Sequence, residues 1–472
     1  MNDADILSCI KGLTADSRMV RRGWLFAAMP GRRADGAGFI KDALLNGASH
    51  VLSAEGTVLP EGSNAVLITD VDARRRFALL AAGFYKLQPQ TVVAVTGTNG
   101  KTSTVTFVSQ LWDMLGHTSA SLGTLGIKSR ITMKAGGLTT PDPVTLHAEL
   151  ADLAAAGITH LAMEASSIGV DQRRLDGVRL AAAGFTNLTH DHLDYHGTME
   201  SYYACKERLF TTLLPEGATA VVYVDDDYGA KLAKALDGKR PLIRIGQEAP
   251  EIKIIKQTPT PFGQILELSV HGKAYTVNLP LVGLFQGINA LVAAGLVMAS
   301  GMGITFETLH PHLEALNVVP GRLQLVAGHP KKAAVYVDYA HTPHGLETVL
   351  KALRPHTQGR LFCVFGCGGD RDKSKRPVMG GIAAKLADVA IITDDNPRTE
   401  DPALIRAEVA AGAPAAKVIG DRKTAIFEAV SSLQAGDVLV IAGKGHEQGQ
   451  IVGDTVHPFD DVKIAEEAIH AI

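Results

Sequence analysis

Seven consecutive residues of this 472-residue chain, Gly97-Thr98-Asn99-Gly100-Lys101-Thr102-Ser103, have the types and spacing of a phosphate-binding loop. The apolar run TVVAVT precedes them and an amphipathic pattern follows, so the loop is expected between a buried strand and a helix. Glycines let the backbone turn its N–H groups toward phosphate oxygens, and a helix N-terminus adds positive charge. Lys101 would contact the terminal phosphates and Thr102 would coordinate magnesium. The sequence predicts ATP binding, although Val95 stands where the commonest form of this loop has glycine; a simple glycine-rich turn is the alternative.

Further candidates for chemistry follow two other apolar runs. Glu164 ends the run HLAME, where a buried strand rarely carries a charge; it is either a metal ligand or a carboxylate satisfied by local N–H groups. A polar cluster resembles a zinc site, but it has no compact partner pair elsewhere in the chain, and we expect most of its members to be hydrogen-bonding loop residues: His190, Asp191, His192, Asp194 and His196. Lys206 falls in a predicted helix, where composition alone indicates a solvated lysine.

The elements that must position these residues alternate between strand and helix. The runs HLAMEAS, AAAGFTN and ATAVVYVD are separated by helical patterns, which indicates a mostly parallel sheet with helices on both faces. Residues 250–280 are predicted to form antiparallel strands that interrupt the parallel pattern. An alanine-rich helix is expected to begin at Asn289. We therefore predict an α/β fold with three domains: residues 1–88, a central P-loop-like ATPase domain over 89–318, and a Rossmann-like domain over 319–472.

Composition limits the possible functions. Hydrophobic residues make up 46% and charged residues 20%, which excludes a disordered, collagen-like or coiled-coil chain. With 46 basic and 49 acidic side chains the net charge is −3, so no global basic field favours nucleic acid. Four scattered cysteines are too few for a disulfide framework, and the spacing of Cys363 and Cys367 indicates buried reduced thiols rather than zinc ligands. No signal peptide or membrane-spanning run is visible, so we expect a cytoplasmic protein.

A set of motifs resembles the Mur ligase family in content and order. The resemblance covers nearly the whole chain, from Asp16 to Glu447, and is carried by TGTNGKTS, LTTPDP, MEASS, NLTHDHLDYHG, the Lys206 segment, DYAHTP, GCGGDRDKSKRP, DNPRTEDP and GKGHE. It is strongest with the branch that adds a diamino acid to UDP-N-acetylmuramoyl-L-alanyl-D-glutamate. Nine motifs in the same order are not a chance match.

The resemblance implies ATP-dependent amide-bond formation in peptidoglycan synthesis. ATP would phosphorylate the D-glutamate side-chain carboxylate, and the amine of meso-2,6-diaminopimelate would attack the acyl phosphate. Such a reaction needs cations and positioned lysines more than a protein nucleophile. By resemblance, Lys206 would be carbamoylated by carbon dioxide, and the catalytic residues would be Lys101, Glu164, His192 and Lys206. Mg²⁺ would be held by Thr102, Glu164, His192 and the Lys206 carbamate.

The remaining binding residues are also carried over by resemblance. Further contacts to ATP are expected from Asn289, Arg322, Asp338 and His341. The nucleotide-sugar dipeptide is expected to bind Ser17, Arg32, Arg33, Ala34, Thr139, Thr140, Ser166, Gln172 and Arg174. The pair Arg32-Arg33 and Ala15 depart from close relatives, which leaves the uridine contacts least defined.

Selection of the amino-acid substrate is expected to depend on the motif DNPR, residues 395–398. Meso-diaminopimelate carries one more carboxylate than lysine, and Arg398 offers a planar fork that can bind it. Its other expected contacts are Arg371, Asp395, Asn396, Pro397, Gly443 and Glu447. The rival functions are a sister ligase adding L-lysine, a folylpolyglutamate synthetase, and a P-loop ATPase with no ligase chemistry. A monomer that binds small molecules is expected.

Overall fold

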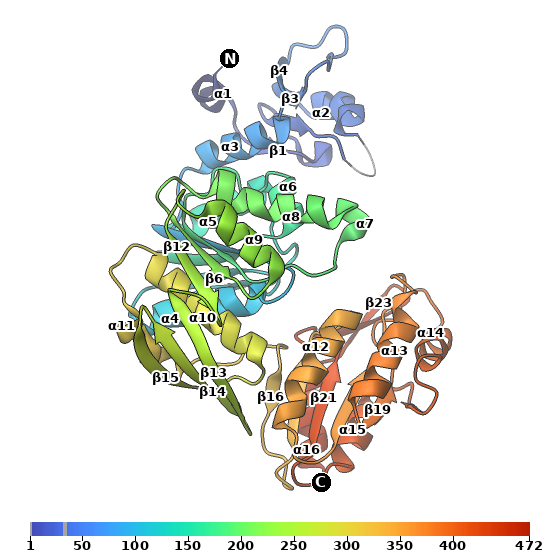
Figure 1. Cartoon of the computed structure of the whole chain (residues 1–472). Coiled ribbons are helices and arrows are strands. Elements are labelled where there is room, and N and C mark those ends of the chain that lie inside the picture. Colours follow the sequence, from blue (N-terminus) through green and yellow to red (C-terminus); the bar gives the residue numbers. More distant parts are fainter. Residues whose placement is uncertain (1, 32–34) are drawn as a thin grey trace. The chain divides into compact units, whose positions relative to one another are not determined.

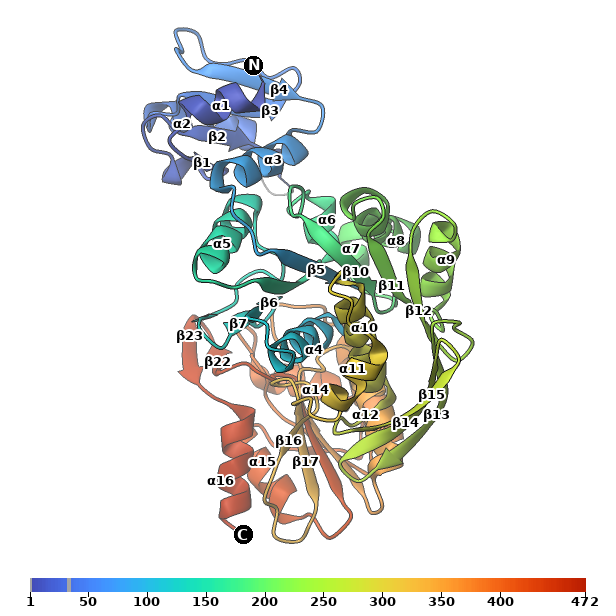
Figure 2. The ribbon, with the colours of Figure 1, turned by 90° about the vertical axis from the view of Figure 1, so that its left-hand side faces the viewer.

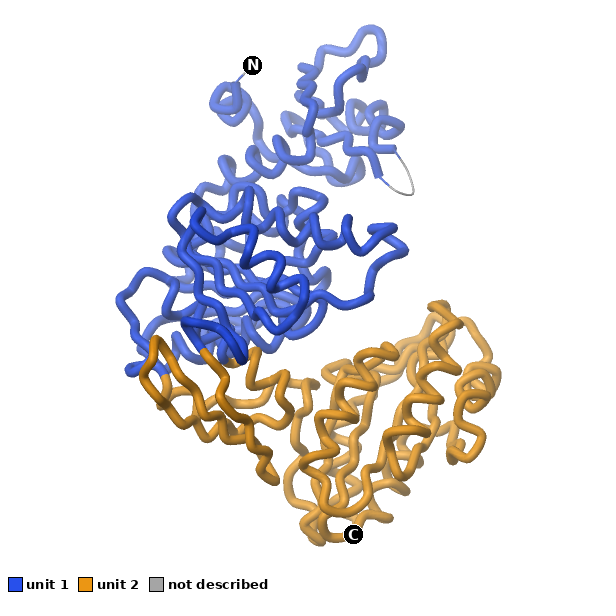
Figure 3. The backbone as a smooth tube through the Cα atoms, in the orientation of Figure 1, with its two compact units in different colours: residues 1–252, 291–309 blue, residues 253–290, 310–472 orange. Residues whose placement is uncertain are grey.

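The computed structural model of the chain describes residues 2–31 and 35–472. They form two compact units, which are described separately below (Figure 3). Unit 1 comprises residues 1–252 and 291–309, and unit 2 comprises residues 253–290 and 310–472. The fold is α/β with mostly parallel sheets, as the alternating sequence pattern predicted.

The first part of unit 1 contains a small parallel sheet in the order β1-β2-β3-β4. Its strands are β1 (Leu13–Thr14), β2 (Leu25–Ala28), β3 (His50–Ala54) and β4 (Val66–Asp70). Its helices are α1 (Asp3–Cys9), α2 (Ile40–Leu45) and α3 (Ala73–Tyr85), with 3₁₀ turns η1 (Ser17–Met19) and η2 (Gly36–Phe39). Asp72 caps α3 by accepting a hydrogen bond from the Arg75 N–H at 3.0 Å. Leu25, Leu52, Phe77 and Leu80 form part of the core between sheet and helices.

The second part of unit 1 contains the strands that position the phosphate loop. They are β5 (Thr91–Thr96), β6 (Ser119–Gly123), β7 (Gly126–Ser129), β8 (Met133–Lys134), β9 (His160–Glu164), β10 (Leu180–Phe185), β11 (Thr219–Tyr223) and β12 (Leu242–Gly246). Their order is β12-β11-β10-β5-β9-β6-β7-β8, and all neighbours are parallel except the β6-β7-β8 edge. Because β5 lies between β9 and β10, the carboxyl ends of these three strands meet at one edge, where doubly wound sheets bind ligands.

Helices cover both faces of this sheet (Figures 1 and 2). They are α4 (Lys101–Met114), α5 (Pro143–Ala155), α6 (Ser167–Asp171), α7 (Leu193–His196), α8 (Met199–Arg208) with the π-helical turn η3 (Leu209–Leu213), α9 (Asp227–Leu236), α10 (Leu284–Ala299) and the start of α11 (Phe306–Leu313). Leu146 and Leu150 of α5 share one core with Tyr202 of α8 and Leu232 of α9. Leu296 of α10 packs so closely on Gly184 of β10 that an added Cβ would lie 3.0 Å from it.

Unit 2 contains a second α/β sheet and an antiparallel excursion. The excursion is β13 (Ile252–Thr260), β14 (Gly263–Val270) and β15 (Lys273–Leu279), with β14 and β15 antiparallel as predicted. The sheet order is β16-β17-β21-β18-β19-β20, parallel except for β16. Its strands are β16 (Gln324–Val326), β17 (Ala334–Asp338), β18 (Leu361–Phe365), β19 (Val389–Ile392), β20 (Lys417–Val418) and β21 (Val438–Ala442), and a hairpin follows, β22 (Gly449–Val452) and β23 (Thr455–Pro458).

Alternate residues of these strands enter two separate cores. Tyr336 and Cys363 face α12 (Pro343–Leu353), α13 (Lys375–Leu386) and α14 (Pro402–Ala410), whereas Val335 and Phe362 face α15 (Arg422–Ser431) and α16 (Asp461–His470). A 3₁₀ turn η4 (Arg354–His356) follows α12. Cys363 and Cys367 are buried free thiols.

One sequence-based expectation about the bounds of an element is corrected. The alanine-rich helix α10 begins at Leu284, five residues before the expected start, because the chain turns at Gly283, whose φ is 87°. No helix among the described residues is long and apolar enough to cross a membrane.

A buried ion pair joins α15 to α16 and generates a stability prediction. Arg422 donates to both carboxylate oxygens of Asp461 at 2.8 and 2.7 Å, and both side chains are fully buried. Asp461→Ala should lower the free energy of unfolding by about 3–5 kcal/mol, because it leaves a buried guanidinium without its partner. Urea unfolding followed by circular dichroism measures this. Glu467→Ala, which breaks the half-exposed Lys423–Glu467 pair between the same helices, is the control and should cost at most about 1 kcal/mol. Equal losses would contradict the prediction.

Candidate active site

The phosphate loop lies where the sequence predicted it, between β5 and α4. Gly97 has φ 153° and an added Cβ would lie 1.9 Å from the Thr186 hydroxyl, so a side chain is sterically excluded there. Gly100 precedes the helix in the left-handed region, with φ 88°. Lys101 is half-buried rather than fully exposed, and its ammonium donates to the carbonyl oxygens of Gly97 and Thr98 at 2.9 and 2.8 Å. The lysine therefore folds back over the loop that would hold the phosphates.

Glu164, at the carboxyl end of β9, lies beside this loop. Its Oε1 accepts hydrogen bonds from the Thr102 hydroxyl at 3.0 Å and from the Thr124 N–H at 2.8 Å. The Thr124 hydroxyl donates to Oε2 at 3.3 Å, and the carboxylate is almost completely buried. The carboxylate thus accepts from a local backbone N–H, as one of the two predicted alternatives requires, and it also contacts the hydroxyl predicted to coordinate magnesium. Thr124 was not predicted, because it is remote in sequence and belongs to no recognised motif.

Lys206 is fully buried, in contrast to the solvated lysine that composition alone indicates. Its ammonium donates to the Gly97 carbonyl oxygen at 2.7 Å and lies 4.6 Å from the ring centre of Tyr202. Burial holds the pKa of Lys206 well below its usual range, and the positive charge of Lys101 lowers that pKa further. A neutral amine at this position can react with carbon dioxide, which a charged ammonium cannot.

The segment after β10 closes the other side of the loop. The Thr186 hydroxyl donates to the Asn99 carbonyl oxygen at 2.6 Å, and the Asn187 side chain accepts from the Asn99 N–H at 2.9 Å. His192 follows in the left-handed region, with φ 52°, and is half exposed. Among residues 2–31 and 35–472, no three His, Cys, Asp or Glu side chains are placed to hold a metal ion. A metal here would depend on Glu164, on the Thr102 hydroxyl, and on ligands that the unmodified side chains lack.

Five residues predicted to bind the nucleotide-sugar dipeptide are brought together: Thr139, Thr140, Ser166, Gln172 and Arg174. Thr140 donates to the Glu164 carbonyl oxygen at 2.9 Å and accepts from the Ser166 N–H at 3.0 Å. Arg174 donates to the Thr140 carbonyl oxygen and to Gln172 Oε1, both at 2.7 Å. Thr139 approaches Thr124 through their hydroxyls at 3.1 Å. This cluster connects directly to the magnesium candidates.

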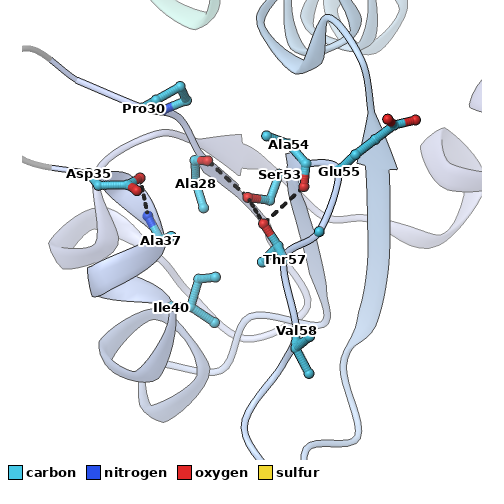
Figure 4. A pocket seen from close by; sticks show the side chains of 11 residues that line it. Ala28, Pro30, Asp35, Ala37, Ile40, Ser53, Ala54, Glu55, Thr57 and Val58 are labelled. Carbon is cyan, nitrogen blue, oxygen red and sulfur yellow. Dashed lines mark hydrogen bonds between the residues drawn. The ribbon is translucent and has the colours of Figure 1, made fainter.

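The first sheet contributes a separate cavity of about 420 Å³ at the carboxyl ends of β2 and β3 (Figure 4). Its walls include Pro30, Asp35 and Glu55; Ser53 and Thr57 bond through their hydroxyls at 2.9 Å. The predicted residues Arg32, Arg33 and Ala34 lie outside the described residues. Ser17 is the first residue of η1. Its carbonyl oxygen accepts a hydrogen bond from the Asn46 side-chain amide at 2.9 Å, within the first part of unit 1. Among the described residues, no hydrogen bond joins Ser17 to the cluster that contains Thr140 and Arg174.

In unit 2, the four further residues predicted to bind ATP form one cluster. Asn289 is buried inside α10, not exposed at its start, and donates to Gln286, which in turn donates to the Arg322 carbonyl oxygen. The Arg322 guanidinium lies 4.6 Å from the ring centre of Tyr339, and the His341 ring 4.6 Å from the same ring. Burial raises the pKa of Asp338, while the nearby charge of Arg322 opposes the shift.

The residues predicted to select the amino acid also converge in unit 2. Asn396 donates to Glu447 at 2.9 Å, and an added Cβ on Gly443 would lie 2.5 Å from Asp395 Oδ2. Asp395 Oδ2 is buried and accepts no hydrogen bond from any residue that the structure describes. Arg398, with φ 51°, donates to the Gly369 carbonyl oxygen at 2.8 Å, and Pro397 precedes it.

The residues predicted to bind the amino acid include basic groups that lie close together. Arg398 and Arg371 both lie next to Gly368, because a Cβ added there would lie 2.8 Å from Arg398 Nη1 and 3.9 Å from Arg371 Cγ. Lys444, which was not predicted, is fully buried and donates to Asn396 Oδ1 at 2.9 Å and to Glu447 at 3.2 Å. The position of Lys444 within the motif GKGHE is the sequence signal that could have identified it.

An α/β fold with a phosphate loop, a buried acidic residue and a buried lysine defines a nucleotide-dependent enzyme class. Comparison with protein families identifies that class further. Residues 9–85 match the Mur ligase family catalytic domain, residues 95–297 the Mur ligase middle domain, and residues 321–445 the Mur ligase glutamate ligase domain. The chain belongs to the Mur ligase family.

Individual relatives agree with this assignment. The chain is 52% identical over 470 residues to the UDP-N-acetylmuramoyl-L-alanyl-D-glutamate–2,6-diaminopimelate ligase of Caulobacter vibrioides, covering 98% of this chain and 96% of that one. It is 50% identical over 453 residues to the ligase of the same name from Brucella melitensis, covering 96% and 92%. A solved structure of such a ligase superposes with a TM-score of 0.73 at 34% identity, covering 98% and 95%. The MurF ligase of Thermotoga maritima in complex with ADP shares the fold, with a TM-score of 0.62 at 20% identity over both whole chains.

The burial of Lys206 generates a prediction about pH and stability. The pKa of Lys206 is lower in the native state than in the unfolded state. At pH values between these two pKa values, the unfolded chain therefore binds one more proton than the native protein. The cost of burying the lysine is therefore present at pH 7 and disappears as pH approaches about 10. Lys206→Met should raise the thermal midpoint at pH 7 in buffer free of carbon dioxide, and the gain should shrink as pH rises.

The exposed Lys234 of α9 provides the matched control. Lys234→Met should leave the midpoint unchanged across the same pH range. A gain for Lys206→Met that grows with pH, or a loss at pH 7, would show that the lysine is not held as a buried amine.

Proposed function

We propose that the chain is an ATP-dependent amide-bond ligase that adds meso-2,6-diaminopimelate to UDP-N-acetylmuramoyl-L-alanyl-D-glutamate, releasing ADP and phosphate. The observation that carries the proposal is the convergence of the phosphate loop, Glu164 and Lys206 at one sheet edge, in a chain about half identical to ligases of that name. The product is a peptidoglycan precursor, which places the enzyme in cell-wall synthesis.

ATP would be held by the loop from Gly97 to Ser103. The N–H groups at the start of α4 and the Lys101 ammonium supply positive potential for the phosphates. Asn289, Arg322, Asp338 and His341 are proposed as further ATP contacts. Magnesium fits the oxygen donors of Thr102 and Glu164, which lie 3.0 Å apart, with His192 as a further proposed ligand. The ion would neutralise phosphate charge as the glutamate carboxylate approaches.

Lys206 is proposed to act as a carbamate. Its lowered pKa favours the neutral amine that reacts with carbon dioxide, and its position at the Gly97 carbonyl oxygen places it beside the phosphate loop. The carbamate would convert the neutral amine into an anionic, carboxylate-like group and would supply oxygen ligands that the unmodified side chains of the described residues lack. Lys206→Met should therefore lose ligase activity while gaining stability.

The two organic substrates are proposed to bind at the remaining clusters. Thr139, Thr140, Ser166, Gln172 and Arg174 offer hydroxyls, an amide and a guanidinium for the sugar and peptide. Ser17 and the segment 32–34 are proposed for the uridine end, together with the cavity lined by Pro30 and Asp35 (Figure 4). Diaminopimelate is proposed to bind the cluster of Arg371, Asp395, Asn396, Pro397, Arg398, Gly443 and Glu447.

Organisation and location complete the proposal. The domain boundaries are proposed at 1–88, 89–318 and 319–472, in a monomeric cytoplasmic enzyme. The sheets at β1–β4, β5–β12 and β16–β21 support three domains. The net charge of −3 and the chemistry of the clusters support small-molecule substrates rather than nucleic acid.

Phosphate release tests the function directly. The enzyme should release phosphate from ATP only when the nucleotide-sugar dipeptide and meso-diaminopimelate are both present, because phosphate leaves after the amine attacks. Lys101→Ala should lower the rate at least about 100-fold, as expected for loss of a positioned charge on the phosphates. Lys234→Ala is the control and should keep the wild-type rate. Full phosphate release without the dipeptide would indicate a P-loop ATPase with no ligase chemistry.

Arg398 tests amino-acid selection. Arg398→Ala should lower kcat/KM for meso-diaminopimelate about 30–100-fold, since a charge-assisted pair with the distal carboxylate is lost, and should leave the KM for ATP unchanged. Arg354, which donates to the Leu386 carbonyl oxygen at 2.9 Å, is the matched arginine; Arg354→Ala should have no effect on kcat/KM. Equal wild-type kcat/KM for L-lysine and meso-diaminopimelate would contradict the proposed selectivity.

A further inference from the structure

We infer that Tyr195 and His196, on the short helix α7, are positioning residues that hold the dipeptide-binding residues in a fixed place relative to the phosphate loop. The inference rests on the proposed function for the identity of the substrate. Neither residue was predicted to contact ATP, dipeptide or amino acid. Both are partly buried, and both use polar ring atoms or hydroxyls to reach other elements of unit 1.

Tyr195 controls the orientation of two proposed substrate contacts. Its hydroxyl donates to Asp171 Oδ2 at 2.8 Å and accepts from Gln172 Nε2 at 3.2 Å. The other end of the Gln172 amide accepts from Arg174 at 2.7 Å. The Gln172 amide is thus held at both ends, by the Tyr195 hydroxyl at its nitrogen and by the Arg174 guanidinium at its oxygen. Without the hydroxyl, Gln172 Nε2 loses its acceptor, and only the contact with Arg174 still holds the amide.

His196 contacts the opposite end of helix α6 from Tyr195. Its Nε2 lies 2.9 Å from the Ser167 hydroxyl, at the first residue of α6, whereas Tyr195 binds Asp171 at the last. Its Nδ1 lies 3.6 Å from the Cys205 thiol, which also lies 3.6 Å from Asp171 Oδ1. Helix α7 therefore fixes α6 at both ends. The residues that flank α6, Ser166 and Gln172, are both proposed substrate contacts.

The same pair reaches the phosphate loop. The His196 ring stacks on Tyr202, with ring centres 4.9 Å apart and an angle of 26° between the planes. The Tyr202 hydroxyl lies 3.1 Å from the Thr98 hydroxyl, and the Lys206 ammonium lies over the Tyr202 ring. Helix α7 also begins directly after His192, the proposed metal ligand. A chain of contacts therefore runs from Arg174 to the loop through α7.

The reaction explains why such a connection matters. A carboxylate is phosphorylated efficiently only when its oxygen is held in line with the terminal phosphate, and small displacements cost large factors in rate. The dipeptide residues and the phosphate loop follow different strands, so rigid connections between them set that distance. One connection runs through Thr140, Glu164 and Thr102. Tyr195 and His196 add a second one without touching the reacting atoms.

The decisive variant is Tyr195→Phe, which removes one hydroxyl and keeps the ring. The KM for UDP-N-acetylmuramoyl-L-alanyl-D-glutamate should rise about tenfold, as expected for loss of a hydrogen bond that involves a charged group, while the KM for ATP and the thermal midpoint stay at wild-type values. Tyr203→Phe is the matched control: Tyr203 also donates its hydroxyl to a carboxylate, that of Glu207 at 2.9 Å, and lies on α8. This control should leave both KM values unchanged.

His196 supplies an independent test through a conservative variant. His196→Ala should lower kcat about tenfold, and His196→Gln, whose amide can occupy the Nε2 position and bond to Ser167, should recover most of the loss. An unchanged dipeptide KM in Tyr195→Phe, or equal increases in the KM values for dipeptide and ATP, would overturn the inference while the ligase function stands. An inactive wild-type enzyme would overturn the proposed function, and this inference with it.

Discussion

Two lysine side chains converge on a single carbonyl oxygen, that of Gly97, and the phosphate loop is organised around this contact. Lys101 reaches it from the start of α4 and Lys206 from α8, at 2.9 and 2.7 Å. Burial lowers the pKa of Lys206, and the positive charge of Lys101 lowers it further. The loop therefore has a partly exposed basic group and a buried one that favours the neutral amine. The proposed ATP phosphates and the proposed Lys206 carbamate would each place negative charge beside Lys101.

The sheet topology brings the opposing charges and hydroxyls to this place. With β5 between β9 and β10, Glu164 and Thr186 reach the loop from either side. A substitution at Gly97 meets the Thr186 hydroxyl, which shows how closely the neighbouring strand covers the loop. Helices α6 and α7 extend the same edge outward to the dipeptide residues. The proposed sites for phosphate, metal and carboxylate therefore lie on the same sheet edge.

The amino-acid site proposed in unit 2 has the same position in its sheet as the phosphate loop has in unit 1. Asp395 and Asn396 follow β19, and Gly443 and Lys444 follow β21, so both segments lie at the carboxyl ends of parallel strands. The buried Lys444 is satisfied by Asn396 and Glu447, which fixes two proposed amino-acid contacts. Within the part of the chain that the structure describes, one buried carboxylate oxygen of Asp395 accepts no hydrogen bond, which is a costly arrangement.

Local patterns in the sequence determined the strands, the phosphate loop and the family. Apolar runs such as TVVAVT and HLAME need only their own composition to indicate buried strands, and the glycine spacing of residues 97–100 is a local backbone requirement. Other features depend on residues far apart in the chain. The burial of Lys206 arises from a contact with Gly97, 109 residues away, and Thr124 meets Glu164 across 40 residues. Tyr195, to which the sequence assigned no role, meets Asp171 and Gln172 only in the folded chain. Exposure, pKa and orientation are properties of the packed surroundings, so only the tertiary structure decided them.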